Sequence, residues 1–142
     1  MDAENLEQSK MTTQFGLELP PNATFELSQE FYFEAAHSLE RKFESEGSRR
    51  IHGHTYFARV AVKGLPDQAN GMVVDLSRLR QAISKVRSKL DHQFLNEVNG
   101  LGPSTIESLC SYIAREISGD FRLSEVEVRR DASGDRCVLK LG

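Results

Sequence analysis

The feature that most limits the fold of this chain is an alternation of apolar and polar residues with a period of two. Successive side chains of a strand point to opposite faces, so residues two apart share a face. Between residues 52 and 62 one face holds His52, His54, Tyr56, Ala58, Val60 and Val62. The odd positions from 25 to 37 repeat the pattern with Phe25, Leu27, Phe31, Phe33, Ala35 and finally His37. The pattern predicts two β segments, the first being one strand or a bulged strand pair.

Two helices are expected further along the chain. Residues 75–90 carry an apolar stripe with helical spacing, and Asp75 is placed to cap that helix. The stripe consists of Leu76, Leu79, Ile83, Val86 and Leu90. Residues 103–117 form the second expected helix, where Ser104 and Glu107 have the spacing of a capping box.

The C-terminal segments SEVEVRR and DRCVLKL are joined by ASG, which predicts a β-hairpin. Two strands, two helices and two strands predict the α+β class, with an antiparallel sheet and two helices on one face. The segments 38–50 and 91–102 are expected to be loops. Residues 23–142 are expected to form one domain. Residues 1–22 lack an apolar period and end in LPPNA, so we expect a flexible N-terminal extension.

Composition and charge exclude several classes of protein. The chain has 142 residues and a net charge of −3, whereas a nucleic-acid binder usually shows a basic excess. No run approaches the roughly 18 apolar residues of a membrane-spanning helix, and the acidic start MDAENLEQSK does not resemble a secretory signal. We therefore expect a cytoplasmic protein without nucleic-acid or membrane partners. Cys110 and Cys137 are expected to be packing thiols.

Three of the four histidines are placed to converge. His52 and His54 share a strand face, and His37 ends the preceding strand at a matching parity. An isolated pair of this kind is often coincidental or structural, and the third histidine is what favours a metal site. Three imidazoles with an open fourth position are typical of a catalytic zinc site, although imidazole also binds Fe, Ni and Cu.

The fourth histidine follows Asp91 directly after the apolar stripe, so both residues are expected at a helix C-terminus. His92 could simply complement the helix dipole there. Alternatively, Asp91 orients and charges His92 as a general acid or base with a pKa near the working pH. The two residues alone do not decide between these interpretations.

Several motifs in this order resemble one known family. FEAAH, HGHTY, GMVVDL, LDHQFLN and PSTIESL are similar to segments of the 6-pyruvoyl-tetrahydropterin synthase superfamily. Within it, the likeness is greatest to the bacterial 6-carboxytetrahydropterin synthases of queuosine biosynthesis. The resemblance implies the tunnelling fold (T-fold), a four-stranded antiparallel sheet with two helices. It also implies homo-oligomers, trimers that commonly stack into hexamers, with active sites at the subunit interfaces.

The resemblance also implies a reaction and a set of site residues. It implies a zinc-dependent lyase acting on the small molecule 7,8-dihydroneopterin triphosphate, in which zinc polarises hydroxyl and carbonyl oxygens of the substrate. The implied zinc ligands are His37, His52 and His54, and the implied catalytic pair is Asp91 and His92. Thr105 and Glu107 fall in the segment that contributes to the pterin pocket, although a capping role explains Glu107 equally well.

The first departure from the family pattern is Ser48, which stands four residues before the HGH motif, where a catalytic cysteine is usual. A serine hydroxyl is far less acidic than a thiol of pKa about 8.5, so it is a poor replacement for a thiolate base. Glu44 and Glu46 are alternative bases, because some family members use a glutamate in this loop.

The second departure is Arg130, which stands where the family places a glutamate that anchors the guanidine-like edge of the pterin. Arginine cannot accept those hydrogen bonds. Either Asp131 replaces the glutamate through a register shift, or the ligand is not an ordinary pterin. Arg129 and Arg130 could hold a phosphate or carboxylate, or could simply be solvated at a strand end.

These departures leave three functions open. The first is the zinc-dependent pterin lyase that the resemblance implies. The second is a diverged enzyme acting on a different pterin-like or phosphorylated substrate. The third is a zinc-binding oligomer without catalysis, which an open three-histidine site disfavours because structural zinc sites normally have four protein ligands.

Overall fold

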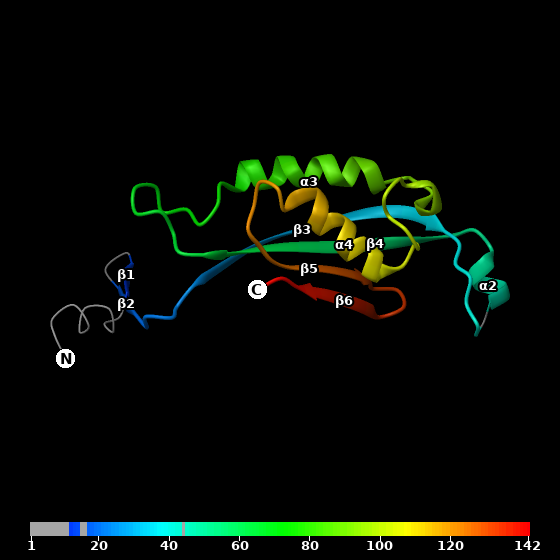
Figure 1. The fold of residues 1–142 in the computed structure, drawn as a ribbon, viewed down its shortest axis with the longest axis horizontal. Helices are drawn as coiled ribbons and strands as arrows, with labels where there is room; N and C mark the ends of the chain where they lie inside the picture. Colours follow the sequence, from blue (N-terminus) through cyan, green and yellow to red (C-terminus); the bar gives the residue numbers. More distant parts are fainter. Residues whose placement is uncertain (1–11, 15–16, 44) are drawn as a thin grey trace.

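A single four-stranded antiparallel sheet forms the body of the protein. The computed structural model describes residues 12–14, 17–43 and 45–142. The strands of the sheet are β3 (Phe25–His37), β4 (His52–Gly64), β5 (Leu123–Arg130) and β6 (Asp135–Lys140). They are hydrogen-bonded in the order β3-β4-β5-β6, and each pair is antiparallel (Figure 1). The first β segment is one continuous strand of 13 residues, which pairs without interruption with β4 from Phe25 to His37.

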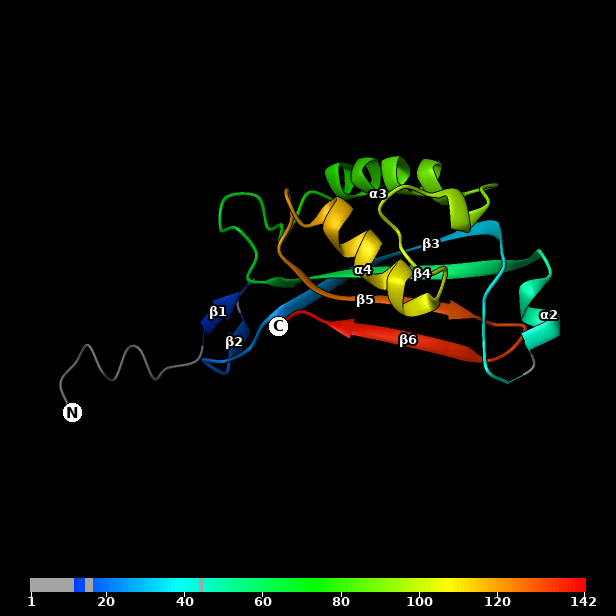
Figure 2. The same cartoon turned by 45° about the vertical axis from the view of Figure 1, so that its right-hand side comes forward.

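Two helices, α3 (Leu76–Leu90) and α4 (Ile106–Ile117), lie on the same face of this sheet (Figure 2). Their apolar stripes pack on the apolar face of the strands and form one core. The largest fully buried side chains include Phe33, Tyr56, Val60, Leu79, Leu90, Leu109, Ile113 and Val126. The predicted α+β fold, a four-stranded antiparallel sheet with two helices on one face, is confirmed.

The N-terminal cap of α3 agrees with the prediction, and that of α4 differs from it. Asp75 caps α3, accepting a hydrogen bond from the Ser77 N–H at 2.9 Å. The predicted capping box of Ser104 with Glu107 is wrong, because the N-cap of α4 is Thr105, whose side chain accepts from the Ser108 N–H. Ser104 is buried instead, and its hydroxyl donates to the Ser38 carbonyl oxygen at 3.1 Å.

Both segments that the sequence assigns to loops contain a short helical turn. The first contains α2 (Ser45–Arg49), where an ion pair between Glu46 and Arg50 at 3.3 Å has the i, i+4 spacing of a helix. The second contains the 3₁₀ turn η1 (Leu95–Glu97), whose Leu95 is buried in the core. The apolar anchor Leu95 fixes the second segment in the core, whereas α2 buries none of its residues.

The other face of the sheet carries ion pairs that cross the strands. Arg59 pairs with Glu26 on β3 and with Glu125 on β5. Arg129 pairs with Glu30 of β3 and stacks over the Phe57 ring, 4.9 Å from its centroid. This face is largely polar and the opposite face is packed against the helices. Polar and apolar residues therefore alternate along each strand.

The N-terminal part contributes a small separate sheet of β1 (Thr12–Gln14) and β2 (Leu17–Leu19). The rest of the predicted extension up to residue 11, with residues 15 and 16, lies outside the described residues, and its flexibility stays a prediction. Within the part of the chain that the structure describes, no helix is long and apolar enough to cross a membrane. Cys110 and Cys137 are both free thiols.

Candidate metal centre

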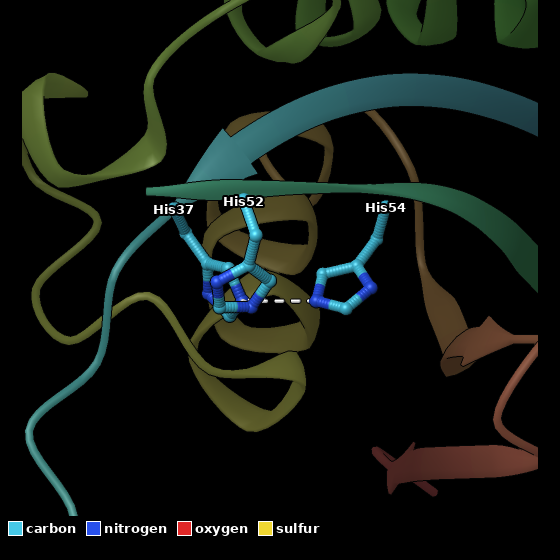
Figure 3. A group of neighbouring side chains, drawn as sticks. All are labelled: His37, His52 and His54. Atoms are coloured by element: carbon cyan, nitrogen blue, oxygen red, sulfur yellow. Dashed lines mark hydrogen bonds between the residues drawn. The ribbon is translucent and has the colours of Figure 1, made fainter. Parts of the chain in front are cut away.

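The three histidines of the alternating strands meet at one end of the sheet (Figure 3). The register of β3 and β4 places His37 opposite His52, and His54 follows on the same face of β4. The Nε2 atom of His37 lies 2.9 Å from Nε2 of His52 and 3.0 Å from Nε2 of His54. The structure thus brings together the three residues that the sequence singles out as ligands.

The hydrogen bonds of the Nδ1 atoms indicate which nitrogen of each ring is available to a metal. Nδ1 of His37 lies 2.8 Å from the Ser104 carbonyl oxygen, and Nδ1 of His52 lies 2.8 Å from the Arg50 carbonyl oxygen. A carbonyl only accepts, so both Nδ1 atoms donate, and in the neutral form of each ring Nε2 then carries the lone pair. Two lone pairs 2.9 Å apart repel each other unless a cation lies between them.

The environment of His37 and His54 favours the neutral form of the ring, which binds metals. Burial lowers the pKa of His37, and it outweighs the hydrogen bond to the Ser104 carbonyl, which acts in the opposite direction. Burial, and then the charge of Arg130, lower the pKa of His54 to about 4. Both rings are therefore unprotonated at neutral pH, as metal ligation requires.

This donor set fits a divalent metal ion. Three imidazole nitrogens leave the fourth position of a tetrahedral ion open, as in catalytic zinc sites. Backbone carbonyls on Nδ1 are also the outer partners that fix ligand rings in metal sites. The residues present therefore fit the metal that the sequence suggests.

A cavity of about 560 Å³ opens beside the three histidines. Ser48 lines it from α2, Thr105 and Glu107 line it from the start of α4, and Arg130 lines it from the end of β5. The Thr105 hydroxyl is already used as the helix cap. Glu107 has no capping hydrogen bond to the backbone in the described structure, so its carboxylate is a better ligand contact than the Thr105 hydroxyl.

Two other candidates lie elsewhere. Glu46 is exposed and paired with Arg50, outside the lining of the cavity. Asp131 does not line the cavity either, because it accepts a hydrogen bond from Nε of Arg129, which pairs across the opposite face of the sheet. Glu44 lies outside the described residues.

Among the lining residues that the sequence did not single out are Ser133, Asp135 and Arg136. They belong to the β5–β6 hairpin, in which Asp135 pairs in register with Arg130. The signal was available, because a short turn between two predicted strands places these opposite charges across from each other.

Asp91 and His92 lie at the C-terminus of α3, as predicted. There they lie beside Glu34 of the edge strand β3. Asp91 accepts a hydrogen bond from the Glu34 N–H at 2.9 Å and pairs with Arg87 at 3.2 Å. His92 is 77% exposed, and its Nε2 lies 3.7 Å from Oδ2 of Asp91. Its φ of 60° is left-handed, a conformation that favours glycine or asparagine at the end of a helix.

The chain then runs from His92 along the free edge of β3, where Phe94 forms a bridge with Ala36. His92 lines a second cavity, together with Glu34, Gly53, Thr55 and also His54. Glu34, Gly53 and Thr55 have the opposite strand parity to the three histidines, so this part of the cavity lies on the side of the sheet without helices. Within one chain, the Asp91–His92 pair therefore lies outside the cavity beside the three histidines.

The fold and the centre define an α+β protein with three convergent histidines, an arrangement that fits a metal ion, at the end of its sheet. A model of the 6-pyruvoyl tetrahydropterin synthase family matches residues 26–138. The chain belongs to this family, as the sequence motifs indicated.

Two proteins with similar sequences support the same family assignment. The chain is similar to the 6-carboxy-5,6,7,8-tetrahydropterin synthase of Synechocystis, with 37% identity over 108 residues, covering 70% of this chain and 81% of that protein. The Haemophilus influenzae protein of the same name is 30% identical over 111 residues, covering 75% and 77%.

Two solved structures are similar to this chain in fold. The Caenorhabditis elegans 6-pyruvoyl tetrahydropterin synthase superposes with a TM-score of 0.71 at 23% identity, covering 84% of this chain and 97% of that one. The Plasmodium falciparum enzyme gives a TM-score of 0.64 at 20% identity, covering 84% and 100%. The predicted T-fold is confirmed.

Proposed function

We propose that this protein is a zinc-dependent lyase of the 6-carboxytetrahydropterin synthase type that acts on 7,8-dihydroneopterin triphosphate. It would work in the cytoplasm as a trimer or hexamer, within pterin or queuosine biosynthesis. The observation that carries the proposal is the pair of Nε2 lone pairs of His37 and His52, 2.9 Å apart, beside a cavity lined by Ser48 and Glu107.

In this proposal each group has a separate task. His37, His52 and His54 hold the ion, which when bound polarises hydroxyl and carbonyl oxygens of the substrate and lowers the cost of removing neighbouring protons. Glu107 contacts the ligand from the start of α4. The Asp91–His92 pair moves protons as a general acid and base. Because this pair lies outside the cavity beside the centre of its own chain, it acts on the centre of a neighbouring copy.

The proposed function is tested by incubating the zinc-loaded protein with 7,8-dihydroneopterin triphosphate. We expect conversion of the substrate, separated and identified by chromatography and mass spectrometry, and loss of conversion after chelation of the metal. A zinc-loaded, folded protein that left this substrate unchanged would exclude the proposed activity.

Ser48 leads to a separate prediction. We expect Ser48→Cys to increase turnover at least about tenfold, since a thiol of pKa near 8.5 supplies a base that a serine hydroxyl does not. Initial rates between about pH 7 and 9 measure the effect, because this range spans the titration of such a thiol. Ser45→Cys is the matched control, because Ser45 lies in the same short helix but does not line the cavity. Equal rates in the two variants would exclude a base at position 48.

A second candidate function is a diverged enzyme acting on another phosphorylated or pterin-like substrate, and Arg130 is the observation that favours it. Arg130 lines the cavity where the family pattern has an acceptor for the pterin, and Asp131 lies outside the cavity. Fluorescence-quenching titration of the zinc-loaded protein with neopterin tests whether the cavity takes a pterin. Saturable quenching supports a pterin or pterin-like ligand, and its absence supports a diverged enzyme whose substrate is not a pterin.

A further inference from the structure

We propose that Arg130 and the metal together form an oxyanion site, in which the guanidinium donates to a carboxylate or phosphate oxygen bound at the open metal position. The inference rests on the proposed function only for the presence of a metal at the three histidines. It goes further by naming the chemistry of the ligand group that this chain selects.

The position of Arg130 is fixed by the strands. It is the last residue of β5 and shares its parity with the buried residues Val126 and Val128, so its side chain lies on the face of the metal centre. Its Nη1 atom lies 3.5 Å from Nε2 of His54, the atom that would hold the metal. Arg129, the preceding residue, points to the opposite face and pairs there with Glu30.

The hydrogen-bond donors of Arg130 are only partly used. Nη2 donates to Oδ2 of Asp135 at 2.6 Å, and that oxygen also accepts from the Ser133 hydroxyl. Nε is buried without a hydrogen-bond partner among the described residues, and the guanidinium also lies beside the buried Tyr56 hydroxyl. A metal on Nε2 of His54 would occupy the lone pair beside Nη1. Nη1 would then remain without an acceptor next to the metal, which is unfavourable in a partly buried site.

The charges around the cavity also favour an anionic ligand. Among the described residues around the cavity, Arg130 pairs with Asp135 and Arg136 pairs with Glu127. A divalent ion beside Arg130 therefore adds positive charge that these pairs do not offset. An anionic oxygen between the ion and the guanidinium offsets the repulsion between these two cations and accepts the free donors of Arg130.

Arginine has no acceptor atom, so the ligand group at this position must itself accept hydrogen bonds. Asp135 remains bound to the guanidinium and fixes its plane. Arg130 is therefore a specificity-determining residue that selects an acidic group on the ligand.

The test uses the Co²⁺-loaded full-length protein, whose visible absorption reports on the fourth metal position. Inorganic phosphate and acetate are titrated separately, and the two arms distinguish a phosphate from a carboxylate site. We expect saturable spectral changes with one or both anions. Arg130→Gln should weaken the anion about 10- to 100-fold, the loss expected for a charge-assisted hydrogen bond, and Arg130→Lys should weaken it less. Arg129→Gln is the matched control and should leave anion binding unchanged.

A second readout separates this role from a structural one. Arg130→Gln removes a cation beside the metal and leaves Asp135 in place, so its affinity for Co²⁺ should equal or exceed that of the wild type. A structural role for Arg130 would instead lower it. Equal anion affinity in the Gln variants at positions 129 and 130, or no spectral response of the wild type, would also overturn the inference.

The outcomes for the two proposals are distinct. Failure of the wild type to bind Co²⁺ would remove both the metal centre and the oxyanion site. Normal anion binding without conversion of 7,8-dihydroneopterin triphosphate would count against the proposed substrate alone.

Discussion

Replacing His52 with alanine is expected to abolish tight metal binding while leaving the fold intact. His52 supplies one of three convergent Nε2 atoms, yet it is only partly buried. Loss of an outer partner of a ligand typically costs about 10- to 100-fold in metal affinity, so loss of the ligand itself should cost more than about 100-fold. Competition with a chromophoric zinc chelator measures this change directly.

Thermal unfolding gives an independent measurement of the same loss. A ligand at roughly a thousand times its Kd stabilises the native state by about 4 kcal/mol, so zinc should raise the Tm of the wild type clearly. The His52→Ala variant should show little or no rise. His92→Asn is the matched control, because it removes a histidine that is not part of the three-histidine cluster, and it should keep the full zinc-induced rise. If His52→Ala bound zinc as tightly as the control, the proposed centre would be wrong.

Strand parity made the sheet and the convergence of the histidines predictable. Side chains alternate strictly along a strand, so placing His37, His52 and His54 required only the two alternating stretches and their antiparallel pairing. The same parity relates Arg130 to the apolar positions Val126 and Val128 and excludes Arg129 from their face. The amino-acid sequence therefore already distinguishes the arginine that faces the centre from the one that does not.

The features that could not be predicted depend on contacts between distant segments. Local spacing favoured Ser104 as a helix cap, but its hydroxyl is bound by the Ser38 carbonyl oxygen, a contact that only the folded chain creates. The face on which His92 lies follows from its left-handed φ and from the pairing of Phe94 with Ala36. Neither has a local sequence signal, because both arise where the end of α3 meets the free edge of β3.

The placement of His92 leads to the second large effect, a loss of activity that a neighbouring copy can restore. His92→Asn should lower turnover by about 10²- to 10⁴-fold, the usual contribution of a general acid or base. Asparagine tolerates the left-handed φ of 60° at this position, so the backbone should be retained. His52→Ala should also be inactive, because its centre does not hold the metal.

Mixing these two inactive variants distinguishes action within one chain from action between chains. If the Asp91–His92 pair serves a neighbouring centre, co-expressed His52→Ala and His92→Asn chains form sites that combine an intact centre with an intact pair. Random assembly of a symmetric oligomer should then restore about one quarter of the wild-type turnover. A mixture of His52→Ala with His54→Ala is the control, and it should stay inactive because every centre in it lacks a ligand. Action within one chain restores no activity in either mixture, because no single chain has both an intact centre and an intact pair.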